Sequence, residues 1–199
     1  MKDKARFFIA GIFIGLSELL PGISGATVAL MFGVYEKILN FLTKLKYINL
    51  VIPLLIGMIL SVFSFSKIIN FIYQNHTYAF NLSIALLMIG YGLFLVTDCY
   101  FNKDINKGKK FFINLLFSVL IGLSLSGFYI SGAYTPNGSF IPSSISLVIF
   151  GFFACSFLLF PGISGSAFLM SVGIYPLIIQ SISNLSVDIL FPFGIGMVF

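Results

Sequence analysis

Long apolar segments, separated by short basic ones, dominate the 199-residue chain. Four segments contain no Asp, Glu, Lys or Arg, namely residues 47–66, 70–97, 111–141 and 142–187. Each is at or beyond the roughly 20 residues that cross a bilayer core as a helix, and the last two are too long for one crossing. Because these segments lack the alternation typical of barrel strands, the pattern predicts an all-α integral membrane protein.

Composition and the placement of charge support this class. Charged residues make up 9% of the chain, against about 25% in soluble domains. Ten of the eleven Lys and Arg residues fall in three clusters, within residues 2–6, 37–46 and 103–110, that would share one side of the membrane. The positive-inside rule then predicts a cytoplasmic N-terminus, with only Lys67 outside. No cluster mixes these charges with aromatic residues for base stacking, so no nucleic-acid partner is expected.

An internal repeat links the two ends of the chain. The segment PGISG occurs at residues 21–25 and again at residues 161–165, an offset of 140 residues. At the same offset, Gly33–Tyr35 meets Gly173–Tyr175 with the glycine and the tyrosine identical. A block of five identical residues followed by a second match at one offset indicates a duplicated unit.

Each copy is predicted to form a helix, a break and a second helix. The helix-breaking residues are Pro21 and Pro161, because proline disfavours the α conformation in the residue before it. Ser24 and Ser164 are placed to act as N-caps of the second helices. The predicted helices cover residues 5–20 and 25–40 in the first copy and residues 145–160 and 165–180 in the second.

The two copies are predicted to lie in opposite orientations. Three crossings are expected between them, at residues 48–66, 78–97 and 111–131. Because three is odd, the second copy enters the membrane from the opposite face. We therefore expect an inverted repeat, with residues 1–144 as a broken hairpin plus three transmembrane helices and residues 145–199 as the truncated start of the second repeat. Broken or re-entrant hairpins that meet near the bilayer midplane are typical of secondary transporters.

The facing breaks predict a site for an anion. Non-helical backbone at membrane depth must be buried in protein or line a polar cavity. The free N–H groups and the positive dipole end at a helix N-terminus favour anions. The predicted phosphate-binding residues are Gly22, Ser24, Gly25, Thr27, Gly162, Ser164, Gly165 and Ser166. The structural alternative is that the serines only cap helices and the glycines only permit close packing.

Glu18 is a carboxylic acid well inside an apolar segment. An ionisable residue within the membrane is a functional candidate by default. Its apolar surroundings and its place in the last turn before Pro21 both favour the protonated form, so we predict a proton-coupling role. The alternative is a neutral acid that binds a freed carbonyl group. Gly11 and Gly15 form a GxxxG pair, for which we predict a packing role.

The sequence offers little to an enzyme. It has no metal-ligand cluster, no nucleophile beside a base, and no phosphate-binding glycine loop with a lysine. We therefore expect no catalysis, no metal and no cofactor. The two cysteines, Cys99 and Cys155, are far apart in the sequence and are interpreted as packing residues.

The segments GLSELLPGISGATVALMFGVYEKI and LLFPGISGSAFLMSVGIYP closely resemble the DUF368 family of bacterial membrane proteins. The resemblance spans the chain and implies a multi-pass protein of the bacterial plasma membrane. It further implies transport of polyprenyl (undecaprenyl) phosphate from the outer to the cytoplasmic leaflet for cell-envelope synthesis, with this lipid and the bilayer as partners. There are two departures: Ala26 stands where the family usually has glycine, and the C-terminal part is missing.

Other functions stay open on the residues alone. One alternative is a channel or secondary carrier for a small anion. Another is a scaffold without transport, which would leave Glu18 and the duplicated serines unexplained. The residues also leave open a homo-oligomer, the coupling ion, and the choice between re-entrant hairpins and short full crossings.

Overall fold

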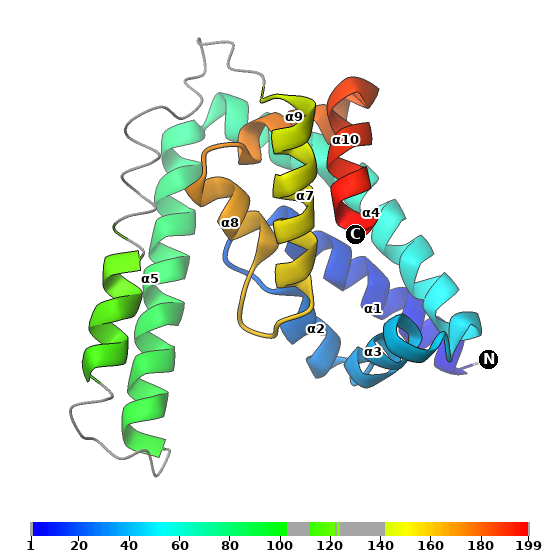
Figure 1. The fold of residues 1–199 in the computed structure, drawn as a ribbon, viewed down its shortest axis with the longest axis horizontal. Coiled ribbons are helices and arrows are strands. Elements are labelled where there is room, and N and C mark those ends of the chain that lie inside the picture. The colour runs from blue at the N-terminus through cyan, green and yellow to red at the C-terminus, as the bar shows by residue number, and fades with distance from the viewer. Residues whose placement is uncertain (1, 103–111, 122, 124–141, 199) are drawn as a thin grey trace.

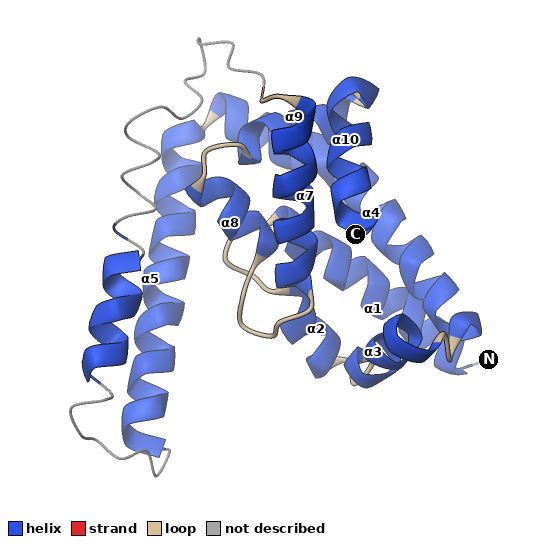
Figure 2. Cartoon of the chain, in the orientation of Figure 1, coloured by secondary structure: helices blue, strands red, loops and turns tan. Residues whose placement is uncertain are grey.

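The computed structural model describes residues 2–102, 112–121, 123 and 142–198, and most of these residues are helical (Figure 2). No strand occurs among them. In chain order, the helices are α1 Lys2–Leu19, α2 Gly25–Met31, α3 Tyr35–Lys44, α4 Ile48–Asn75, α5 Thr77–Asn102, α7 Ser144–Leu158, α8 Gly165–Ser171, α9 Tyr175–Asn184 and α10 Val187–Val198 (Figure 1). A further short helix covers Phe112–Ile121.

Two of the described helices are long and apolar enough to cross a membrane. They are α4 and the segment Thr77–Phe94 of α5. The number rises to four if the bent pairs α2–α3 and α8–α9 each count as one span. Large apolar side chains are exposed along α5, among them Leu86 and Phe94, as expected for a surface that contacts lipid tails. The predicted all-α membrane fold is confirmed.

The sequence repeat is also a structural repeat. At an offset of 140 residues, α8 has the bounds of α2 and α9 has the bounds of α3. The glycines of the two motifs adopt the same left-handed conformation, with φ of 93° at Gly22 and 90° at Gly162. α10 corresponds to the first part of α4 at an offset of 139 residues, which pairs Pro192 with Pro53. The same arrangement of four helices therefore occurs twice.

Glycines let the paired helices of each repeat touch backbone to backbone. A Cβ atom on Gly11 of α1 would lie 2.1 Å from a carbonyl oxygen atom of α4, and one on Gly15 would lie 2.7 Å from another. Gly57 of α4 meets a carbonyl oxygen atom of α1 in the same way, at 2.3 Å. The α7–α10 pair repeats this contact through Gly151 and Gly196. The packing role predicted for the GxxxG pair is confirmed.

The second helix of each copy is broken, and the prediction of one continuous helix is wrong. In place of residues 25–40, the chain forms α2 and α3, which meet at an angle of 115°. In place of residues 165–180, it forms α8 and α9, at 118°. The cause is the left-handed backbone of Gly33 (φ 62°) and Gly173 (φ 79°), which is a common way to end a helix.

Other boundaries agree more closely, with one correction. The helices before the motifs begin and end within three residues of their predicted ends. The first predicted crossing, residues 48–66, is too short, because α4 continues to Asn75 and includes Lys67. The third predicted crossing, residues 111–131, is described only at residues 112–121 and 123, and the basic cluster at 103–110 lies wholly outside the described residues. The division into residues 1–144 and 145–199 stays a prediction.

Candidate functional site at the two PGISG motifs

The breaks of the two repeats lie against each other. The backbone N–H of Gly162 donates a hydrogen bond to Oγ1 of Thr27, at 3.0 Å. The hydroxyl group of Ser166 donates to the carbonyl oxygen atom of Leu20, at 3.3 Å. Each of these bonds joins one motif to the other across more than 130 residues of chain. The meeting of the two breaks, predicted from the sequence, is therefore present.

In the second motif, the serines are paired. Ser164 precedes α8 and its Oγ accepts a hydrogen bond from the backbone N–H of Ala167, at 3.2 Å. Its hydroxyl group also lies 3.0 Å from that of Ser166. Both serine side chains are buried. The N-cap role predicted for Ser164 is confirmed.

In the first motif, the matching serine makes no such bond. Ser24 precedes α2 with extended backbone, but its side chain does not cap the helix. Its Oγ is buried and has no hydrogen-bond partner. The position predicted for an N-cap is right, whereas the capping hydrogen bond is absent.

Glu18 takes over the capping role in the first motif. Its Oε1 accepts a hydrogen bond from the backbone N–H of Gly25, at 2.9 Å. A Cβ atom on Gly25 would lie 2.3 Å from the same oxygen atom, so glycine leaves the room that the carboxyl group occupies. The second copy has leucine at position 158 in place of this acid, so Ser164 supplies the cap there. Glu18 therefore accepts a hydrogen bond from an N–H group. The alternative role considered for Glu18, a neutral acid that binds a freed carbonyl group, is not the contact seen.

The predicted site glycines have different surroundings. Gly165 packs closely on the backbone of Ala154, with a Cβ position 2.6 Å from the carbonyl oxygen atom. A Cβ atom on Gly22 would meet the side chain of Met88 at 2.9 Å, whereas one on Gly162 would meet nothing within 4 Å. Gly165 therefore serves close packing, whereas the positive φ angles of Gly22 and Gly162 are the stronger reason for glycine at those two positions.

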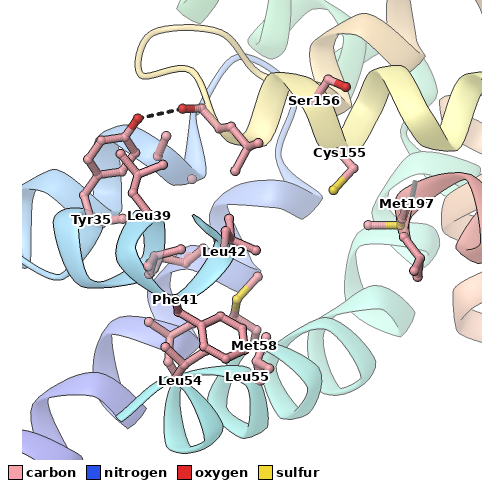
Figure 3. A pocket seen from close by; sticks show the side chains of 18 of the residues that line it. Tyr35, Leu39, Phe41, Leu42, Leu54, Leu55, Met58, Cys155, Ser156 and Met197 are labelled. Carbon is pink, nitrogen blue, oxygen red and sulfur yellow. Dashed lines mark hydrogen bonds between the residues drawn. The ribbon is translucent and has the colours of Figure 1, made fainter. Parts of the chain in front are cut away.

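A cavity of about 360 Å³ extends from the first motif (Figure 3). It is lined by residues of α1, α2, α3 and α4 on one side and of α7 and α10 on the other, and most of their side chains are apolar. Gly25 and Ala26, at the start of α2, form part of its wall, as do Cys155 and Ser156 of α7. The cavity thus joins the N-terminal end of α2 to an apolar space.

Two tyrosines join the repeats by hydrogen bonds, and no role for them was predicted from the sequence. The hydroxyl group of Tyr35 donates to the carbonyl oxygen atom of Leu159, at 2.7 Å (Figure 3). The hydroxyl group of Tyr175 donates to the carbonyl oxygen atom of Leu19, also at 2.7 Å. Both tyrosines and both leucines are related by the offset of 140 residues. Their recurrence in the alignment of the two copies was the signal that could have found them.

No Asp, Glu, Lys or Arg side chain is among the described residues that line the cavity. Arg6 donates through Nε to the carbonyl oxygen atom of Phe32, at 2.9 Å, at the C-terminal end of α2. No group of three His, Cys, Asp or Glu side chains that could hold a metal ion occurs among the described residues. The polar groups near the motifs are therefore hydroxyl groups, backbone amides and the one carboxyl group of Glu18.

A profile of a known family, described as undecaprenyl phosphate translocase-like, matches residues 14–199. The chain belongs to this family. It is the family that the DUF368 resemblance named, so that identification is confirmed. Membership makes the chain a multi-pass membrane protein of a lipid-carrier transporter family.

Two curated relatives carry the name polyprenyl-phosphate transporter. The protein from Vibrio cholerae is 24% identical over 211 residues, which cover 96% of this chain and 64% of the relative. The protein from Staphylococcus aureus is 26% identical over 177 residues, which cover 81% of this chain and 59% of the relative. The chain therefore spans less than two thirds of the length of these relatives. No solved structure matches it.

Proposed function

We propose that the protein moves polyprenyl phosphate from the outer to the cytoplasmic leaflet of the bacterial plasma membrane, for use in cell-envelope synthesis. The observation that carries the proposal is the joining of two environments at one place. Polar groups of the two motifs are joined by hydrogen bonds, and Gly25 and Ala26 at the start of α2 line the apolar cavity. A lipid phosphate needs both environments, because its head is anionic and its tail is a hydrocarbon. The names of the two relatives point to the same lipid.

The head group is proposed to bind between the motifs. The candidate ligands are Gly22, Ser24, Gly25, Thr27, Gly162, Ser164, Gly165 and Ser166. Ser24 is the first choice among them, because its buried hydroxyl group is left without a partner. A buried polar group without a partner is costly, and a phosphate oxygen atom would supply one. Hydroxyl and amide donors suit an anion that must be released again.

Glu18 is proposed to couple this binding to protons. Its carboxyl group accepts the N–H of Gly25, which is one of the donors that the phosphate would use. A carboxylate and a phosphate at one N–H group would repel each other, so the phosphate favours a protonated Glu18. Inward movement of an anion against a potential that is negative inside costs about 2.3 kcal/mol per charge for each 100 mV. A proton carried on Glu18 from outside to inside would offset that cost.

The orientation of the chain belongs to the same proposal. With the N-terminus in the cytoplasm, the basic clusters at residues 2–6 and 37–46 lie on the cytoplasmic side, as the positive-inside rule requires. The first motif then opens from the cytoplasmic face and the second from the outer face.

The test is depletion of the protein in cells, followed by measurement of polyprenyl phosphate on the outer leaflet. Accumulation there, reversed by the wild-type chain and not by the Ser24→Ala variant at equal abundance, supports the proposal. An unchanged lipid distribution contradicts it and favours a carrier for a small anion.

A further inference from the structure

The two tyrosine bonds form a matched pair across the repeats. Tyr35 and Tyr175 are the first residues of α3 and α9, directly after the bends at Gly33 and Gly173. Each hydroxyl group reaches the carbonyl group two residues before the proline of the other repeat. Carbonyl groups in the last turn of a helix lack partners within that helix, so each tyrosine satisfies one of them. Any movement of one repeat against the other must strain these bonds.

The two bonds have different surroundings. Tyr175 is 1% exposed and belongs to a large apolar cluster, in which its ring stacks on that of Phe80 at 6.3 Å. Tyr35 is half-buried, and both it and its partner Leu159 line the 360 Å³ cavity. The Tyr175 bond therefore lies in a packed region, and the Tyr35 bond lies at the wall of the cavity. Both bonds are formed in this structure, and the Tyr35 bond has less packing around it than the Tyr175 bond.

We propose that Tyr35 and Tyr175 are two clasps that act in opposite senses in the transport cycle. Each clasp holds one side of the paired motifs closed, and the site opens on that side when the tyrosine hydroxyl group leaves the carbonyl group of the other repeat. The proposal rests on the proposed transport function, because a carrier must open its site to the two leaflets in turn. In the predicted inverted arrangement of the repeats, the two clasps serve opposite sides. Both tyrosines are positioning residues and neither touches the phosphate.

Phenylalanine is the sharp substitution at both positions, because it keeps the ring and removes the hydroxyl group. Cys155 is a built-in reporter, since it lies one turn before Leu159 on α7 and lines the cavity. The Cys99→Ser background leaves it as the sole cysteine, because the chain has two. The rate at which a charged thiol reagent labels Cys155 then reports how far the cavity side is open. Tyr78→Phe is the matched control, since that side chain is 82% exposed.

Tyr35→Phe should raise the labelling rate of Cys155, and Tyr175→Phe should lower it. Each shift should be about fivefold, which corresponds to the roughly 1 kcal/mol of one hydrogen bond. The double variant should return towards the wild-type rate, because the two losses offset each other. Amide hydrogen exchange is measured in parallel, with faster exchange expected at the start of α3 in Tyr35→Phe and at the start of α9 in Tyr175→Phe.

A purely structural role predicts a different pattern. Both single variants would then loosen the protein, and the double variant would be labelled fastest of all. That result, or two single variants that leave both labelling and exchange unchanged, overturns the proposal. Lipid transport is measured separately. Opposite shifts in the labelling rate without lipid transport would support the clasps and contradict the proposed substrate. Lipid transport with both labelling rates shifted in the same direction would contradict the clasps alone.

Discussion

The two PGISG motifs have the same backbone conformation and differ in the side chains that hydrogen-bond to it. In the second motif, Ser164 caps its helix and pairs with Ser166. In the first motif, the carboxyl group of Glu18 takes the helix N-terminus, and Ser24 is buried without a partner. The second motif is thus satisfied by its own residues, whereas the first carries an acid and an unused hydroxyl group. The repeated residues set the geometry, and the unrepeated ones carry the candidate chemistry.

The largest expected effect concerns the side of the membrane on which each copy lies. Lys44→Cys and Asn184→Cys form a matched pair, since they replace the exposed last residues of α3 and α9. With the native cysteines removed, an impermeant thiol reagent should label Asn184→Cys in intact cells. It should label Lys44→Cys only after permeabilisation. Labelling of both variants in intact cells would contradict the inverted arrangement.

The next effect separates the acid from the rest of the first motif. Glu18→Gln keeps an acceptor for the N–H of Gly25 but cannot exchange a proton. Head-group binding should survive, while the response of transport to an imposed pH gradient should be lost. Glu36→Gln is the control, because that exposed carboxyl group lies outside the site. A normal pH response in Glu18→Gln would make this residue a structural acid.

A smaller effect compares the two serines directly. Ser24→Ala removes an unpartnered hydroxyl group, so the free energy of unfolding should hardly change. Transport should fall about tenfold if this group binds the phosphate, since a hydrogen bond to a charged group contributes roughly 1.5–3 kcal/mol. Ser164→Ala should lower transport too. Unlike Ser24→Ala, it should in addition lower the free energy of unfolding by about 1 kcal/mol, because it removes an N-cap. Equal stability losses and unchanged transport in the two variants would leave both serines as caps.

The smallest effect concerns the bond between the motifs. Thr27→Val removes the acceptor for the N–H of Gly162. The loss of one hydrogen bond should lower the free energy of unfolding by about 1 kcal/mol. The pH response should stay intact. Thermal unfolding checks the first point, and a loss of pH response would move part of the coupling to Thr27.

The parts of the fold that follow from local rules could be predicted from the sequence. The apolar segments gave the membrane class, and Pro21 and Pro161 gave the ends of α1 and α7 to within two residues. The bends at Gly33 and Gly173 were missed, although both glycines were visible in the repeat. A glycine inside an apolar pattern is compatible with a continuous helix, and only its positive φ angle reveals the end of that helix.

The candidate site was predictable in position and less so in its bonds. The prediction that the two breaks lie against each other was correct. It followed from the repeat, because duplicated segments form equivalent structures. The capping of α2 by Glu18 in place of Ser24 could not be predicted. It depends on how a side chain of the preceding helix folds back onto Gly25. Bonds between distant segments, such as the one from Tyr175 to Leu19, need the tertiary arrangement of both repeats.

The most direct measurement of the central claim is lipid flux in reconstituted vesicles. The purified chain is placed in vesicles with polyprenyl phosphate in the outer leaflet, and the appearance of this lipid in the inner leaflet is followed with and without an acidic exterior. Transport that an acidic exterior accelerates in the wild type and not in Glu18→Gln is the predicted result. Flux of inorganic phosphate without movement of the lipid would contradict the account.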